Sequence, residues 1–439
     1  MSAQIPRLHL AIPLQVILAV CLLLFTASCS LVQPGSPSPA AATQAAVPTD
    51  SKLAPTPPAN LEVTPAPAEF IRIWLPPQFD PQADAPAAKI LKTHLELFIA
   101  LNPGVQIEVR IKAEDGPGDL LDSLSTANVA APLALPDLVV LSRPLLEIAA
   151  IKGYVKPLDS LAPFLDDSNW YEYARQLGRL QDSAFGLPLA GEALVVVFRS
   201  ADIAQAPKTW EEVLSLETVF GFPAGDSQAM FTLAQYQAAE GLVQDGQGRP
   251  TLDEATLAEV LSFYQAAQNA GVFPYWLTQF DAEAQAWEAW DSGQFPLSVT
   301  WSTRFLQLPG GPGVEVSPLP TRSGQLYTLA RGWVWAVASP NPDRQELALR
   351  LAKHLSDPVF LGQWTAAGGY LPPHPAALRE WPVDSRSQFV SELVESARLS
   401  PSENLLSTLG PILRQAALAV LRQQIDPAQA ASQAVELLK

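Results

Sequence analysis

The stretch from residue 70 to residue 141 decides the fold class of this chain. It holds FIRIW at 70–74, VQIEVRI at 105–111 and LVVL at 138–141. The first two segments alternate apolar and polar residues and the third is continuously apolar, so each predicts a β-strand. A continuous apolar strand is typical of a sheet that is covered on both faces.

Helical patterns separate these strands. Leu91, Leu95 and Phe98 recur on one helical stripe, which ends at Asn102-Pro103-Gly104. Residues 120–130 predict a further helix. Because strands and helices alternate, we expect parallel strands joined by crossover helices, which is an α/β architecture.

The middle of the chain repeats this theme. Residues 194–198 and 297–301 predict strands, and two more strands are expected on either side of Arg331-Gly332. From Pro342 onward helical patterns dominate. The chain therefore predicts two α/β lobes followed by a helical C-terminal part.

Cys29 ends an N-terminal segment that resembles a bacterial export signal. Arg7 gives a basic start, residues 16–25 are apolar, and Thr26-Ala27-Ser28 precede the cysteine. This order is that of a signal peptide with a lipobox, cleaved before Cys29 with lipid attached to its sulfur. The position three before the cysteine is usually Leu and here is Thr26. The alternative is an uncleaved N-terminal helix that anchors the chain by itself.

A segment poor in large apolar residues follows. Residues 30–68 contain nine prolines and nine alanines, a composition that predicts an extended tether without a core. The second cysteine, Cys21, lies inside the signal, so no disulfide or catalytic thiol is expected in the folded part.

Composition argues against several function classes. The chain has 27 Lys and Arg against 44 Asp and Glu, and its Lys and Arg form no run, which disfavours nucleic acid as a partner. The four histidines lack metal-ligand spacing, and no nucleophile elbow or glycine-rich phosphate loop occurs. Acidic pairs such as Asp166-Asp167 fit solvated caps better than acid–base catalysis. We expect no catalytic residue, no metal and no cofactor.

The eleven tryptophans all follow the tether. An indole at a strand end can stack on a sugar ring or face a cation, whereas an indole elsewhere usually packs in a core. Ligands of open α/β sheets bind beyond the carboxyl ends of the strands. We therefore expect Trp74 and Trp301 to contact ligand, and Trp335, Trp287 and Trp290 to serve packing.

Ordered short motifs resemble those of extracellular solute-binding proteins of the maltose-binding-like kind, the receptors of ABC importers. The resemblance extends over residues 69–380. Its motifs include Pro136-Asp137-Leu138-Val139, Gly153-Tyr154-Val155-Lys156-Pro157-Leu158-Asp159, Phe185-Gly186-Leu187-Pro188, Pro207-Lys208-Thr209-Trp210-Glu211-Glu212 and Gly369-Tyr370-Leu371-Pro372. The chain departs from many relatives at Leu141-Ser142-Arg143 and Gln294-Phe295-Pro296.

The resemblance implies a two-lobed periplasmic-binding fold with crossing hinge strands. Its parts would be a signal peptide (1–28), a tether (29–68), lobe one (69–190 with about 318–356), and lobe two (191–317) with the C-terminal helices (about 357–439). A monomer tethered by lipid outside the membrane would capture a small solute, most simply a sugar, and deliver it to ABC importer membrane subunits. The implied ligand-binding residues are Trp74, Glu192, Trp301, Arg331, Trp333 and Tyr370.

Alternatives remain at this point. Glu192 and Arg331 would also suit an ion pair at the hinge or between the lobes. The solute could be a polyamine or a peptide, and the fold could serve a lipid-anchored sensor, an adhesion protein or an exported enzyme.

Residues 185–198 are expected to form the first crossing between the lobes, with Gly186 and Gly191 absorbing the rotation of a hinge.

Overall fold

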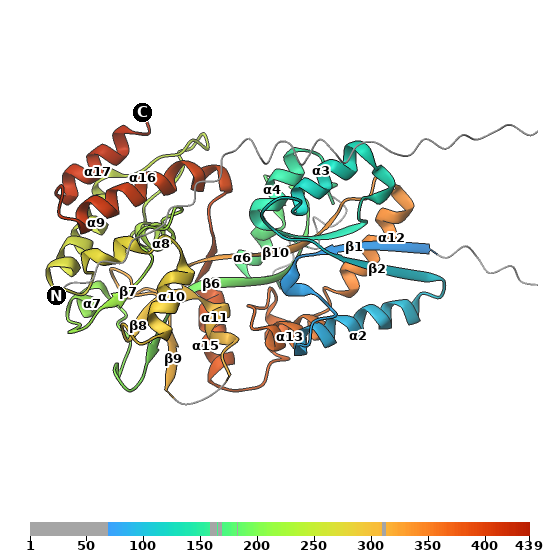
Figure 1. The fold of residues 1–439 in the computed structure, drawn as a ribbon, viewed down its shortest axis with the longest axis horizontal. Coiled ribbons are helices and arrows are strands. Elements are labelled where there is room, and N and C mark those ends of the chain that lie inside the picture. Colours follow the sequence, from blue (N-terminus) through green and yellow to red (C-terminus); the bar gives the residue numbers. More distant parts are fainter. Residues whose placement is uncertain (1–68, 159–164, 166–168, 182, 310–312) are drawn as a thin grey trace, which may run out of the picture. The chain divides into compact units, whose positions relative to one another are not determined.

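The structure is a computed structural model that describes residues 69–158, 165, 169–181, 183–309 and 313–439 (Figure 1). The predicted signal, Cys29 and the tether lie outside these residues, as does the Asp166-Asp167 pair. The described strands form a nine-stranded sheet and a separate two-stranded one. The strand order along the large sheet is β2-β1-β3-β10-β6-β8-β7, with β11 beside β10 and β9 beside β6.

The first part of the sheet is parallel, as the sequence predicts. Strand β1 lies between β2 and β3, and both pairs are parallel. The crossover helices α2 and α3 connect them, and α4 follows β3. The elements are β1 (Glu69–Leu75), η1 (Pro77–Phe79), α2 (Pro86–Leu101), β2 (Val105–Ile111), α3 (Leu120–Ala130), η2 (Pro132–Ala134), β3 (Leu138–Ser142) and α4 (Arg143–Ile151).

Two long strands cross from the first part of the sheet to the second. Strand β6 (Leu187–Arg199) pairs with β10 (Thr328–Val337) through its first half and with β8 through its second half, both antiparallel. Strand β10 also pairs with β3 in antiparallel fashion, so the sheet is mixed rather than wholly parallel. The expectation of two strands around Arg331-Gly332 is wrong, because one continuous strand carries both residues.

The second part of the sheet follows β6. Helices fill the connections between its short strands. Its elements are α7 (Trp210–Leu214), β7 (Phe220–Gly221), α8 (Met230–Ala238), α9 (Glu254–Asn269), η4 (Tyr275–Gln279), α10 (Glu283–Asp291), β8 (Leu297–Trp301), α11 (Ser302–Leu306) and β9 (Val314–Ser317). Helix α7 starts as its sequence predicts, with the Thr209 hydroxyl accepting from the Glu212 backbone N–H at 3.1 Å.

The C-terminal part is helical except for one short strand. It comprises α12 (Pro342–His354), α13 (Pro358–Gly368), α14 (Pro375–Leu378), α15 (Ser385–Ser396), β11 (Ala397–Leu399), α16 (Glu403–Leu421) and α17 (Pro427–Glu436). Strand β11 pairs with the start of β10. After β6 and β10, it is the third segment of the chain that lies where the two parts of the sheet meet. Between β3 and β6 lie α6 (Glu172–Leu177) and the hairpin of β4 (Arg179–Leu180) and β5 (Ser183–Ala184).

Three clusters of buried apolar side chains form the core. Two of them cover opposite faces of the first part of the sheet, and the third joins the second part to α8, α9, α16 and α17. Helices α12, α13 and α15 contribute to the first cluster together with β1 and α2. The lobe boundaries stay a prediction. On this packing we propose that the second segment of lobe one, which begins at about residue 318, ends at about residue 396 instead of about residue 356.

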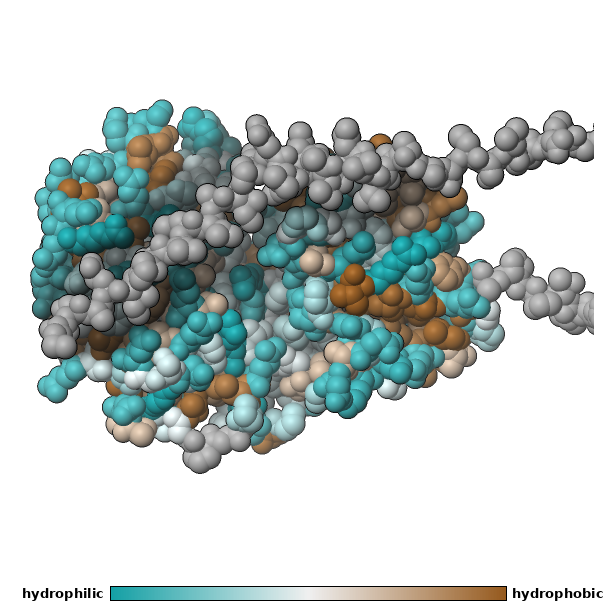
Figure 2. Space-filling model, viewed as in Figure 1, coloured by the Kyte–Doolittle hydropathy of each residue, from teal (hydrophilic) through white to brown (hydrophobic). Residues whose placement is uncertain are grey.

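Helix α16 is long and apolar enough to cross a membrane by length and composition alone. Half of its most apolar stretch is buried, and the helix packs against α8, α9 and α17 (Figure 1). It therefore serves as a core helix. Figure 2 shows that hydrophilic residues cover most of the visible face of the described body, with a hydrophobic patch over the region of β1, β2 and α2.

Candidate functional site

Glu192 and Arg331 face each other on the two crossing strands. They are register partners of β6 and β10, and the Arg331 Nε donates to Glu192 Oε1 at 2.6 Å. Glu192 is 4% exposed, whereas 47% of the Arg331 side chain is exposed. The pair thus joins a buried carboxylate to a cation at the surface, in keeping with the alternative interpretation of both residues as a hinge ion pair.

Trp301 lies directly beneath this arginine. It ends β8, is 6% exposed, and has the Arg331 guanidinium 3.9 Å from its ring centroid. Thr303, at the start of α11, donates its hydroxyl to the second oxygen of Glu192. The structure therefore brings Glu192, Trp301 and Arg331 together and adds Thr303, which the sequence does not predict as a site residue.

A pocket of ≈340 Å³ opens beside Trp301 and Arg331. Its walls also carry the carboxylates of Asp226, Asp281 and Glu283. Local donors already engage these groups: Asp226 accepts from the backbone N–H groups of residues 228 and 230, Glu283 pairs with an arginine at 3.3 Å, and Asp281 pairs with another at 3.6 Å. The pocket is polar, and its acidic groups are largely satisfied.

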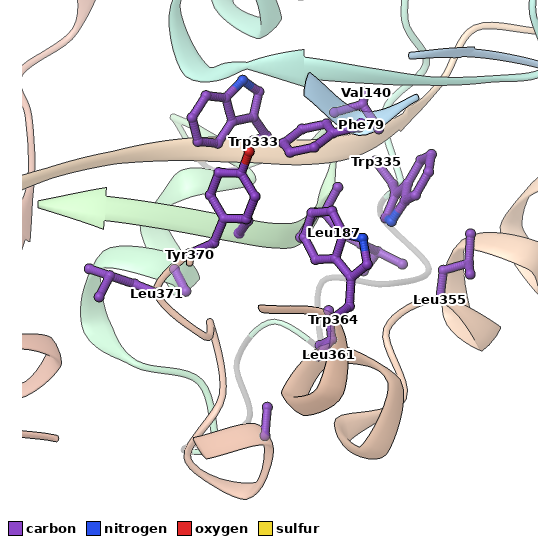
Figure 3. Close-up of a cluster of buried hydrophobic side chains, with 14 of the residues drawn as sticks. Phe79, Val140, Leu187, Trp333, Trp335, Leu355, Leu361, Trp364, Tyr370 and Leu371 are labelled. Carbon is purple, nitrogen blue, oxygen red and sulfur yellow. The ribbon is translucent and has the colours of Figure 1, made fainter. Parts of the chain in front are cut away.

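Trp333 and Tyr370 belong to an aromatic wall, which we define as Phe79, Trp333, Trp364 and Tyr370 (Figure 3). Tyr370 stacks on Trp364 with centroids 5.4 Å apart, and Phe79 packs edge-on against the other three rings. Figure 3 shows the Tyr370 hydroxyl directed toward Trp333, whose ring centroid is 5.8 Å from that of Tyr370. Aromatic pairs of this kind contribute about 0.5–1.5 kcal/mol each beyond the area that they bury.

Polar groups border the aromatic wall. The Trp333 Nε1 donates to Glu114 at 3.0 Å, and Gln78 donates to the other oxygen of that carboxylate at 2.6 Å. Burial raises the pKa of the Tyr370 hydroxyl, and the nearby charges of Glu192 and Glu114 raise it further. Because the charge of Glu192 affects the pKa of Tyr370, the aromatic wall lies close to the Glu192–Arg331 ion pair.

Trp74 does not join this group. Residues 71, 73 and 75 of β1 face the cluster that contains Phe79, so alternation turns Trp74 to the opposite face, under α3 and α4. Trp74 is 3% exposed there, and the Lys112 ammonium lies 5.2 Å from its ring centroid. Its position at a strand end, which predicted ligand contact, coincides with a core position.

Tryptophans expected to serve packing do so. Trp335 and Trp290 are each 1% exposed, and Trp287 is packed against Trp290 with centroids 4.9 Å apart. Phe79, Glu114 and Trp364 were missed as members of the site. Their local sequences give no signal beyond a turn or a buried helix face, since only the tertiary fold places them beside Trp333.

The crossing strands carry glycines for a steric reason. A Cβ on Gly191 would overlap the Tyr173 ring, and a Cβ on Gly332 would overlap the Ala190 carbonyl oxygen. Gly186 is equally crowded by Val334. These glycines permit close approach of backbone and ring, and the hinge rotation expected of Gly186 and Gly191 stays a prediction.

A comparison with known protein families finds a match. Residues 97–389 match the family model described as bacterial extracellular solute-binding protein. This span is two thirds of the chain and contains all the candidate site residues of the crossing strands and the aromatic wall except Phe79. A comparison with curated protein sequences finds no match.

Solved structures share the fold at low sequence identity. The maltose-binding protein MalE of Listeria monocytogenes, in complex with maltose, is 14% identical, with 84% of this chain and 97% of that chain covered and a TM-score of 0.69. The cyclic α-maltosyl-1,6-maltose binding protein of Arthrobacter globiformis is 16% identical over 85% and 98%, with a TM-score of 0.66. The sugar-binding protein MalE of Xanthomonas citri is 17% identical over 84% and 97%, with a TM-score of 0.65.

Proposed function

Because the chain belongs to the bacterial extracellular solute-binding proteins, we propose that it captures a sugar or oligosaccharide between its two lobes and delivers it to an ABC importer. The ligand would lie along Trp333 and Tyr370 and reach Arg331 and Trp301. A ligand that touches both lobes binds the closed form better than the open form and so shifts the population toward closure.

One observation carries this proposal, namely the edge of the aromatic wall beside polar groups. Trp333 and Tyr370 retain 9% and 6% exposure, next to the Glu114 carboxylate. A sugar ring has apolar faces that pack on aromatic rings and a rim of hydroxyls that hydrogen-bond to carboxylates and guanidinium groups. The solved neighbours that bind maltose or maltodextrins support the same ligand class.

A polyamine is the second candidate, favoured by Asp226, Asp281 and Glu283 in the pocket beside Trp301. A cation would need carboxylates with free oxygens. In this structure both oxygens of Asp226 accept backbone hydrogen bonds, and both of Glu283 contact Thr300 or Arg304. Asp281 keeps an exposed carboxylate with one arginine contact at 3.6 Å, so two of the three acids are already engaged, and a neutral ligand fits this arrangement better. Thr303 donates its hydroxyl to Glu192, but that carboxylate is also paired with Arg331, so we propose binding rather than catalysis.

The test is a thermal-shift screen of the full-length protein against sugars, maltodextrins and polyamines. A specific ligand should stabilise by roughly 2.7 kcal/mol at a hundredfold excess over its dissociation constant. With the best ligand, small-angle scattering should report a smaller radius of gyration. Stabilisation by polyamines alone would overturn the sugar proposal, and an unchanged scattering profile at saturation would favour a sensor or adhesion protein.

The membrane tether is part of the same proposal. We expect lipid on Cys29 after cleavage of residues 1–28. Cys29→Ala should abolish lipid labelling and signal removal. Normal maturation and membrane retention of that variant would show that the N-terminal helix is the anchor.

A further inference from the structure

Three of the four histidines of the chain meet in one pocket. His94 lies on α2, His354 ends α12, and His374 precedes α14. The pocket has a volume of ≈680 Å³, and its other lining residues include Leu97, Trp170, Lys353, Asp357 and Val359. Segments separated by up to 280 positions in the sequence therefore build a single imidazole-rich site, which we call the histidine pocket.

His94 and His354 are in direct contact. Their ring centroids are 5.8 Å apart, and His354 Nε2 lies 3.2 Å from the backbone oxygen of His94. The Nδ1 of His94 is buried and has no hydrogen-bond partner among the described residues. Burial lowers the pKa of His94, and His354 lowers it further, while Asp357 opposes both. The site thus favours a neutral His94.

Few negative charges are available to offset protons in this pocket. Helix α2 contributes His94, α12 contributes His354 and Lys353, and the turn before α13 contributes Asp357. The Asp357 carboxylate already caps α13 by accepting from the Val359 N–H at 2.9 Å. His374, on the remaining side, accepts the Ala376 N–H at its Nδ1 and so caps α14. A proton on His94 would therefore add a positive charge directly beside His354 and Lys353.

Helix α13 connects the histidine pocket to the aromatic wall through a series of stacked and tilted rings. The His94 ring is 4.8 Å from Phe360, Phe360 is 6.1 Å from Trp364, and Trp364 is 5.4 Å from Tyr370. Phe360 and Trp364 are four residues apart, so they share one face of α13. Gly369, in the left-handed conformation with φ of 70°, ends the helix directly before Tyr370.

We propose that the histidine pocket is a proton-responsive site that regulates the aromatic wall. Protonation of His94 places a cation beside His354 and Lys353, repels α2 from the α12–α13 turn, loosens α13, and thereby loosens Tyr370. The link to ligand affinity rests on the proposed function, whereas the link between the two sites does not.

The direction in which stability changes with pH follows from the buried His94. The unfolded chain takes up its proton near the ordinary pKa of 6.5, and the folded chain does so only at lower pH. The stability contribution of neutral His94 is therefore complete above pH 6.5 and is lost as the pH falls through the folded-state pKa. Loosening of α13 follows the same direction, so acid should weaken the wall.

The first experiment needs no ligand. Urea unfolding and amide hydrogen exchange, corrected for intrinsic rates, are measured on the full-length protein at about pH 7.5 and about pH 5.5. The wild type should lose stability in acid and exchange faster at the amides of Tyr370 and Leu371, which donate to the Thr365 and Gly191 carbonyls. His94→Gln and, as a second variant, His354→Gln should show a much smaller response.

His374→Asn is the matched control. It keeps an N-cap acceptor for α14 and leaves the ring series intact, so it should respond to pH as the wild type does. Equal pH responses of the wild type, His94→Gln and His354→Gln would overturn the proposal. A pH-dependent stability with unchanged exchange at residues 370–371 would overturn the coupling to the aromatic wall.

The second experiment measures maltodextrin affinity by calorimetry at the same two pH values. The wild type should bind roughly fivefold more weakly in acid. Phe360→Leu should keep the pH dependence of stability and lose that of affinity. If maltodextrin does not bind at either pH, the proposal that it is the ligand is wrong. The hydrogen-exchange measurement still tests the coupling between the histidine pocket and the aromatic wall.

Discussion

Replacing Trp74 with alanine should destabilise the protein and leave ligand affinity unchanged. Trp74 is 3% exposed and packs with Leu120, Leu124 and Val139 between the sheet and its covering helices. Its Nε1 has no hydrogen-bond partner among the described residues, so the loss is one of packing.

The magnitude follows from this packing. Truncation of a buried tryptophan to alanine costs about 3–5 kcal/mol, from lost burial and the cavity that remains. The cation–π contact with Lys112 adds only about 0.5–1 kcal/mol, the value for exposed sites. Trp74→Phe retains much of the buried area and should lose less.

The assay is urea unfolding followed by circular dichroism, with affinity for the ligand measured by calorimetry well below the unfolding midpoint. The midpoint should fall while the m-value stays the same. Trp333→Ala is the contrasting variant, since it alters the aromatic wall and should weaken binding. An unfolding free energy within about 1 kcal/mol of the wild type for Trp74→Ala, together with lost binding, would refute the core assignment.

Three further variants test other parts of the structure. Gly191→Ala should cost about 1–3 kcal/mol of unfolding free energy by urea titration, because its Cβ overlaps Tyr173; a neutral effect would show that this ring can move. Arg331→Met should cost about 1–3 kcal/mol, since it leaves the Glu192 carboxylate without its charged donor, and a shifted tryptophan emission should accompany it. Burial and Glu147 raise the pKa of Glu403, so Glu403→Gln should stabilise at neutral pH, and the gain should vanish below about pH 4.5, as unfolding at both pH values would report.

Much of the fold follows from local pattern. The strict alternation at 105–111 and the helical pattern at 120–130 predict β2 and α3 with the bounds that the structure has. The strand at 194–198 is also confirmed, although β6 begins seven residues earlier. Apolar periodicity identifies such elements because each buries one face locally.

The rest depends on partners that are distant in the sequence. The sequence predicts two strands on either side of Arg331-Gly332, yet one strand, β10, runs through both residues, and a Cβ at position 332 would overlap the Ala190 oxygen. The antiparallel position of β10 between β3 and β6 leaves no local trace. The sequence predicts Glu192, Arg331 and Trp301 as site residues, and the structure places them in contact. The burial of Trp74 has no such local signal, because it depends on which face of β1 the helices cover.

The sheet order also dictates the sequence in which the molecule can be assembled. Strand β10 separates β3 from β6, although β3 ends at Ser142, β6 ends at Arg199, and β10 ends at Val337. Strands β3 and β6 can take their places beside β10 only after the ribosome has synthesised β10, which comes much later in the chain. Contacts of such high sequence separation slow folding, and a partly synthesised chain keeps open strand edges that invite aggregation. If this chain is exported unfolded, its sheet can close only after β10 has also crossed the membrane.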